Sequence, residues 1–174
     1  MIWIFPAFVT YIIAQISIFC CRNVARKVPT NYIILTIFTV AFSFIVTWIT
    51  AGYPVDIVLQ AAAATALTTV ALTIYAFKTD TDLTMMGGLI WIASVALMMI
   101  ILTFAIFSPA TLYSPFLCGI IVCFYGFFLI YDTQLVAGGR KHQLDVDDYV
   151  IGAMIIYTDI IMLFLELLKL LGRR

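Results

Sequence analysis

The stretch Tyr149–Leu171, YVIGAMIIYTDIIMLFLELLKLL, decides the fold, because it is long and apolar enough to cross a lipid bilayer as a helix. Asp159 lies near the middle of this stretch, where a charged side chain costs roughly 2.5–3.5 kcal/mol on insertion scales. Asp132 lies at the end of the preceding hydrophobic segment. Two acids in apolar surroundings predict a proton-controlled path for cations, since a chain seldom keeps such residues without a partner or a function.

The composition predicts an integral membrane protein. Hydrophobic residues make up 65% of the 174 residues and charged residues 10%, against about 25% charged residues in a typical soluble domain. The formal net charge is zero and the sequence has no basic tail, so no nucleic-acid partner is expected. No linker or repeat divides the sequence, and residues 1–174 are expected to form a single transmembrane helical domain in contact with membrane lipid.

Neither a disulfide framework nor an enzyme is expected. Cys20 and Cys21 are adjacent, and Cys118 and Cys123 face different directions on one predicted helix, so the cysteines are interpreted as small apolar packing residues. The single histidine, His142, lies in a polar loop, which argues against a zinc site. The sequence lacks a Ser/His/Asp set, a phosphate-binding glycine loop, an HExxH motif and a CxxC pair. No cofactor is therefore expected.

Six segments reach or approach the length of about 20 apolar residues that a membrane-spanning helix needs. Each span is expected to be helical, because lipid offers no partner for unpaired backbone groups. Turn and cap residues separate the segments, such as Pro29-Thr30-Asn31 before the second and Asp82 or Thr84 before the fourth. The predicted spans are residues 3–21, 32–51, 56–77, 86–107, 115–136 and 149–171.

The basic residues predict an orientation in the membrane. Under this division six of them lie on one side and three on the other, near the C-terminus. The positive-inside rule then places the side with six in the cytoplasm, or in the matrix of a mitochondrion. The six are Arg22, Arg26, Lys27, Lys78, Arg140 and Lys141, and the three are Lys169, Arg173 and Arg174.

Asp132 and Asp159 are expected to lie on neighbouring antiparallel helices, because only residues 137–148 separate their segments. A bend at Gly138-Gly139, or a helix break near Asp132, would bring them to similar depth. Within hydrogen-bonding reach the two carboxyl groups would share one proton, which predicts a pH switch. Arg22 is the candidate cation for a two-bond contact with this pair, and the alternative is an ordinary cytoplasmic anchor.

Other polar residues near the acid pair are given secondary roles. Glu166 follows Asp159 by seven residues on the same helical stripe. It is expected to pair with Lys169, and the alternative is a second station on an ion route. Thr133 and Gln134 are further candidates for that route. With the two aspartates they predict a weak, transient cation site, since a high-affinity calcium site takes six to eight oxygens.

The remaining charged residues near the spans are interpreted as ordinary surface residues. Arg26 and Lys27 are expected to be cytoplasmic anchors. Asp145, Asp147 and Asp148 are expected to be solvated loop acids, with one of the last two capping the final helix.

Motifs along the chain resemble those of a known family. They are Cys20-Cys21 before a basic cluster and Pro29-Thr30-Asn31; Ala76-Phe77-Lys78-Thr79 with Asp82, Thr84 and Gly87-Gly88; Tyr131-Asp132-Thr133-Gln134-Leu135 with Gly138-Gly139; and Tyr157-Thr158-Asp159-Ile160-Ile161 with Leu163-Phe164-Leu165 and Gly172. Together they resemble the BAX inhibitor-1 (transmembrane BAX inhibitor motif) family, and the first group looks most like its Lifeguard branch.

The resemblance implies an all-α integral membrane fold. Family members have seven membrane-spanning helices, so the six predicted here resemble helices two to seven. A helix of a partner protein is one candidate to replace the first. The resemblance also implies a pH-controlled calcium leak linked to cell-death regulation. In family members the aspartates that match Asp132 and Asp159 form a proton-sensitive pair that an arginine can engage, and Arg22 lies at a similar place. The implied location is the endoplasmic reticulum or Golgi membrane, with the mitochondrial inner membrane as the alternative.

Three functions therefore compete. The favoured one is a pH-gated cation leak with Asp132 and Asp159 as the gate and calcium as the transported ion. The second is a structural or accessory subunit of a larger membrane complex, in which the two aspartates are a buried structural pair. Partner proteins that co-purify with the chain would reveal such a complex. The third is a calcium/proton exchanger of the mitochondrial inner membrane, which requires coupled counter-transport.

Overall fold

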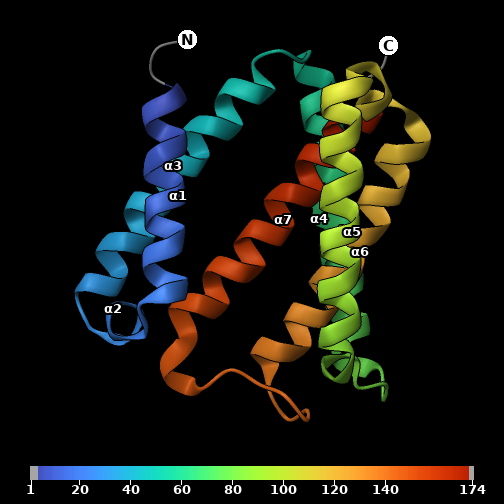
Figure 1. Ribbon diagram of the computed structural model, residues 1–174. Helices are drawn as coiled ribbons and strands as arrows, with labels where there is room; N and C mark the ends of the chain where they lie inside the picture. The colour runs from blue at the N-terminus through green and yellow to red at the C-terminus, as the bar shows by residue number, and fades with distance from the viewer. Residues whose placement is uncertain (1–3, 173–174) are drawn as a thin grey trace. The chain divides into compact units, whose positions relative to one another are not determined.

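The computed structural model describes residues 4–172, without the side chains of Arg22, Asn23 and Tyr113. Within these residues all regular structure is helical, which confirms the all-α prediction (Figure 1). Seven α-helices and three short 3₁₀ turns follow one another along the described chain: α1 Ile4–Cys20, α2 Arg22–Arg26, α3 Thr30–Thr50, α4 Val55–Lys78, η1 Leu83–Met86, α5 Gly87–Phe107, η2 Pro109–Tyr113, α6 Pro115–Ala137, η3 Val146–Asp148 and α7 Tyr149–Leu171.

Five of the described helices are long and apolar enough to cross a membrane, and they correspond to the last five predicted spans. The first predicted span, residues 3–21, is shorter than expected, because α1 has 17 residues and the chain leaves the helix at Cys21, whose φ and ψ are −113° and 80°. Trp3 lies outside the described residues. Large apolar side chains are exposed along the spans, including Leu67, Trp91 and Phe107 at 74%, 72% and 81%. Contact with lipid explains this exposure.

The helix ends follow from local chemistry. Asp82 precedes η1 and its Oδ1 accepts a hydrogen bond from the Thr84 backbone N–H at 3.0 Å, as expected of a cap. Ser114 caps α6 in the same way, with its Oγ accepting from the Leu117 N–H at 3.2 Å. Gly138, at φ 74°, ends α6.

Contacts divide the chain into two units, which are described separately below. Unit 1 comprises the chain up to Val55 together with residues 144–155, and unit 2 comprises residues 56–143 together with the chain from Ile156 onward. The helix α7 therefore contributes its first part to unit 1 and the remainder to unit 2.

Unit 1 is built on an aromatic core between α1 and α3. The ring of Tyr11 stacks on Phe38 with 5.2 Å between centroids and lies 4.8 Å from Phe42. All three side chains are buried. Because large rings bury much apolar area, this cluster holds the two helices together.

Unit 2 has a core where α4, η1 and α6 meet. Ala76, Leu83 and Ile130 are buried there, and Leu72, Phe127 and Tyr131 pack against them. Gly126 of α6 allows a close approach of α4, since a Cβ at this position would lie 3.2 Å from Leu72 Cδ1. This core fixes the position of the C-terminal half of α6, which carries Asp132.

Candidate ion-gating site

Asp132 of α6 and Asp159 of α7 are in contact within unit 2. Each residue is 8% exposed, and the two carboxyl side chains are hydrogen-bonded to each other. Because a carboxylate has no proton to donate, this bond requires a proton on one of the two groups. This contact supports the shared proton expected from the sequence, and both the proton sharing and the gating role stay predictions.

The two aspartates reach similar depth without a break in α6, which continues as a helix through Asp132 to Ala137. The bend expected after α6 is present, since Gly138 and Gly139 both have φ of 74°. The share of α7 that belongs to unit 2 begins at Ile156, close before Asp159. Because the first part of α7 belongs to unit 1, the number of residues between the start of α7 and Asp159 does not measure how deep Asp159 lies in unit 2.

A cavity of about 330 Å³ lies beside Asp159. Its walls are mainly apolar, and Ser94 brings a hydroxyl that donates to the carbonyl of Ile90 at 2.7 Å. The Oδ2 atom of Asp159 is buried and has no hydrogen-bond partner among the described residues. The lining residues are Ser94, Leu97, Met98, Ile101 and Leu102 of α5, Phe124, Tyr125 and Phe128 of α6, and Asp159.

Among the described residues no group of three or more His, Cys, Asp or Glu side chains gathers around a common point. The weak cation site predicted at Asp132 and Asp159 therefore has two carboxyl groups to offer. A calcium ion takes six to eight oxygens, so water would have to complete its shell. The weak, transient cation site stays a prediction.

Gln134 makes contacts that sequence reasoning missed. Its side chain is buried and is bonded to backbone groups on three sides: Nε2 donates to the carbonyls of Ala76 at 3.2 Å and Thr81 at 3.1 Å, and Oε1 accepts from the N–H of Leu83 at 2.9 Å. Gln134 thus ties the loop after α4 to α6. Its role on an ion route stays a prediction, and its neighbour Thr133 is buried in the same turn of α6.

A second set of contacts joins the loop after α4 to the loop after α6. The Oδ2 atom of Asp82 accepts from the backbone N–H of Lys141 at 3.0 Å, and Thr84 Oγ1 accepts from the N–H of His142 at 3.2 Å. Arg140 donates to the carbonyl of Thr79 at 2.5 Å. The hydrogen bonds from the Thr84 side chain and then from the Lys141 backbone lower the pKa of Asp82.

Glu166 pairs with Lys169, as expected from their spacing. Lys169 Nζ lies 2.5 Å from Glu166 Oε1, while Glu166 Oε2 is buried without a hydrogen-bond partner among the described residues. Both residues line a smaller cavity of about 110 Å³ together with Ile101, Leu112 and Ile121. A station for ions at Glu166 remains a prediction.

Unit 1 corrects the interpretation of two charged residues. Asp148 is not a solvated loop acid: it is 2% exposed and is held by Arg26 through two bonds, at 2.7 Å from Nε and 2.8 Å from Nη2. Arg26 also bonds the exposed Asp145 at 2.8 Å, so it is more than a cytoplasmic anchor. The hydrogen bonds that Arg26 donates to Asp148, and then the one it donates to Asp145, raise the pKa of Arg26.

The predicted contact of Arg22 with the acid pair involves a side chain outside the described part of the chain. Arg22 begins α2 in unit 1. Arg26, one turn later, carries the observed arginine–aspartate contact. The repeat of acids at Asp145 and Asp148 was the available signal, because that spacing presents two carboxylates to one guanidinium.

The cysteines also differ from expectation. Cys118 is buried and is a packing residue, as predicted. The packing interpretation is wrong for Cys20, Cys21 and Cys123, which are exposed.

These observations define a polytopic all-α membrane protein with a buried pair of acids. The profile of the family described as "Inhibitor of apoptosis-promoting Bax1" matches residues 1–174, and the chain belongs to this family. The resemblance inferred from the motifs is thereby confirmed.

Three relatives resemble the chain along almost all of its length. Protein lifeguard 3 from Homo sapiens is 33% identical over 98% of this chain, and protein lifeguard 3 from Mus musculus is 34% identical over 98%. Protein LIFEGUARD 2 from Arabidopsis thaliana is 30% identical over 96% of this chain and 70% of its own length. The chain spans 56% of the length of the two lifeguard 3 proteins.

Proposed function

We propose that the chain is a pH-sensitive leak path for cations in an intracellular membrane, gated by Asp132 and Asp159, with calcium as the transported ion. The observation that supports this most is the hydrogen bond between two buried carboxyl groups on different membrane-spanning helices. The description of the family adds support for a membrane role connected with apoptosis.

The gate works through the shared proton. While the pair holds it, the hydrogen bond joins α6 to α7. When the proton leaves, two like charges face each other in surroundings of low dielectric constant, where their repulsion is strong. The contact between α6 and α7 then loosens, and a carboxylate becomes available to a cation.

The cavity beside Asp159 provides room for a hydrated ion next to the gate. Glu166, Thr133 and Gln134 are the proposed secondary groups on the route, and Arg22 is the proposed cation that engages the pair. The membrane of the endoplasmic reticulum or Golgi is the proposed location. A structural subunit and a calcium/proton exchanger are the alternatives that the experiment below separates from a leak.

The test is calcium flux into liposomes that contain the purified chain, between about pH 6 and pH 8, where the proposed gate is expected to lose its proton. We expect a wild-type flux that changes with pH and an Asp159→Asn variant whose flux does not. Asp147→Asn, the same change at an exposed loop acid, is the matched control and keeps the wild-type profile. No flux from folded wild type supports the structural subunit instead, and flux that requires a proton gradient supports the exchanger.

A further inference from the structure

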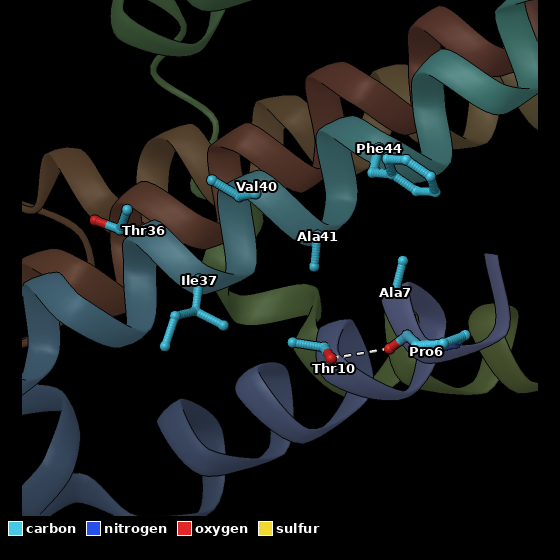
Figure 2. A pocket seen from close by; sticks show the side chains of 8 residues that line it. All are labelled: Pro6, Ala7, Thr10, Thr36, Ile37, Val40, Ala41 and Phe44. Carbon is cyan, nitrogen blue, oxygen red and sulfur yellow. Dashed lines mark hydrogen bonds between the residues drawn. The ribbon is translucent and has the colours of Figure 1, made fainter. Parts of the chain in front are cut away.

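Unit 1 contains an apolar groove between α1 and α3 (Figure 2). Its larger part has a volume of about 490 Å³ and is lined by Pro6, Ala7, Thr10, Thr36, Ile37, Val40, Ala41 and Phe44. A second part, of about 180 Å³, shares Thr10 and Ile37 with the first and continues along Ile13, Ala14, Ser17 and Ile34. The two parts form one groove that follows α1 from Pro6 to Ser17.

The few polar groups of this groove are already satisfied. Thr10 Oγ1 donates to the carbonyl of Pro6 at 2.8 Å, the contact drawn in Figure 2. Ser17 donates to Ile13 at 2.7 Å and Thr36 to Tyr32 at 2.8 Å. Because these hydroxyls are bonded to the backbone of their own helices, the groove presents apolar walls and favours an apolar occupant.

Two exposed thiols lie where the groove ends. Cys20 follows Ser17 by three residues on α1, the spacing that continues one face of a helix, and Cys21 comes next, where the chain leaves the helix. The helix α1 ends at Cys20 and a basic segment follows, with Arg26 and Lys27. Basic residues of this kind mark the cytoplasmic surface of a membrane, and juxtamembrane cysteines at that surface are sites of S-acylation.

The length of the groove fits a fatty-acyl chain. From Pro6 to Ser17, at about 1.5 Å of rise per residue, α1 covers about 16 Å. One leaflet of a bilayer has a hydrocarbon depth of about 15 Å, half of the full core. A chain attached at the surface end of the groove would thus extend along it to about the middle of the membrane.

We propose that Cys20 and Cys21 form an S-acylation site and that the attached chain lies in the groove between α1 and α3. A cysteine thiolate attacks the thioester carbonyl of a long-chain acyl-coenzyme A, a new thioester forms, and the coenzyme A thiolate leaves and takes up the proton that the cysteine released. The acyl chain then covers the apolar groove. This proposal does not depend on the calcium leak.

The first test is acyl exchange, in which hydroxylamine cleaves thioesters and a maleimide polymer labels the freed thiols, on the whole chain expressed in eukaryotic cells. We expect hydroxylamine-dependent labelling of the wild type, and its loss in the variant with Cys20→Ser and Cys21→Ser. Cys123→Ser is the matched control, because Cys123 is also exposed but lies in the middle of α6; it retains the labelling. Unlabelled wild type, or labelling that the double variant retains, would overturn the site.

The second test places the chain in the groove. Cells are fed a fatty acid that carries a photoreactive diazirine near its end, and the acylated protein is irradiated and digested. We expect adducts on the α3 peptide that contains Val40, Ala41 and Phe44. Adducts on lipid alone, or on helices of unit 2 alone, would overturn the groove as the binding place.

Discussion

At the scale of single residues, buried polar side chains connect the helices and loops of unit 2. Asp132, Thr133 and Gln134 are consecutive in α6 and all are buried. Their side chains face different neighbours because successive helical residues point about 100° apart. Asp132 meets Asp159, whereas Gln134 meets the loop after α4. One turn of α6 thus holds both the proposed gate residue Asp132 and Gln134, whose hydrogen bonds to Ala76, Thr81 and Leu83 are called the clamp below.

We predict that Gln134→Leu destabilises the protein by roughly 3 kcal/mol, because it leaves the buried Ala76 carbonyl and Leu83 N–H, and the part-buried Thr81 carbonyl, without their partner. Unfolding of the purified protein in mixed micelles by added denaturing detergent measures the change. Gln143→Leu serves as the control, since Gln143 is exposed and accepts a hydrogen bond from the Gly139 N–H at 2.8 Å. Equal stability of the Gln134 variant and the wild type would mean that the clamp contributes nothing.

Asp82 gives a pH dependence whose sign follows from its lowered pKa. A carboxylate with a depressed pKa stabilises the fold above its unfolded pKa, about 3.9, and this contribution is lost as pH falls through the lower folded value. We predict that Asp82→Asn is less stable than the wild type at pH 7. The difference in stability should shrink as the pH falls below about 4, and thermal unfolding in micelles across pH 7 to pH 3 measures it. A difference that stays constant with pH would contradict the role of the charge.

At the scale of elements, most helices could be predicted from hydropathy and turn residues. Residues 149–171 and 115–136 were expected to span the membrane, and α7 and α6 occupy 149–171 and 115–137. These boundaries are readable because Pro, Gly and capping residues act locally. The short helix α2 was missed because five residues carry no periodic pattern of their own.

The end of α6 allows a prediction about backbone conformation. Gly138 has φ of 74° and ψ of −171°, a conformation essentially confined to glycine that costs a residue with a Cβ about 1–3 kcal/mol. Its Cβ would also lie 3.2 Å from Gln143 Oε1. We predict that Gly138→Ala destabilises unit 2 by about that amount, measured by unfolding in micelles. Gly88→Ala, where nothing lies within 4 Å of the added Cβ, should be neutral or stabilising. The opposite order of the two variants would refute this explanation.

At the scale of the whole molecule, side-chain contacts between residues far apart in sequence were the features that the sequence did not predict. The two aspartates were identified because acids inside apolar segments are rare. The contact of Arg26 with Asp148 joins residues 122 apart in sequence, and the spacing of Asp145 and Asp148 does not say which distant basic residue those two acids bind. The same holds for Gln134, whose partners follow a different helix.

The division of α7 between two units also could not be read from the sequence, because the helix is continuous from Tyr149 to Leu171. Its hydrophobic pattern does not show which turns pack with which neighbours. From the sequence, either a bend at Gly138-Gly139 or a helix break near Asp132 could bring Asp132 and Asp159 together, and the structure shows the bend and no break in α6. The roles of Asp132, Asp159 and Arg22 in gating remain predictions that functional measurements must test.

The most direct measurement is calcium flux against pH for liposomes that hold wild type, Asp132→Asn, Asp159→Asn or the double variant. Residues that act as one unit give non-additive effects. If the two carboxyl groups share one gating proton, each single variant loses the pH dependence and the double variant changes the flux profile no further. Helical circular dichroism and a single size-exclusion peak verify that each variant is folded. Additive effects of the two substitutions, or a pH dependence that survives in all three variants, would contradict the shared-proton gate.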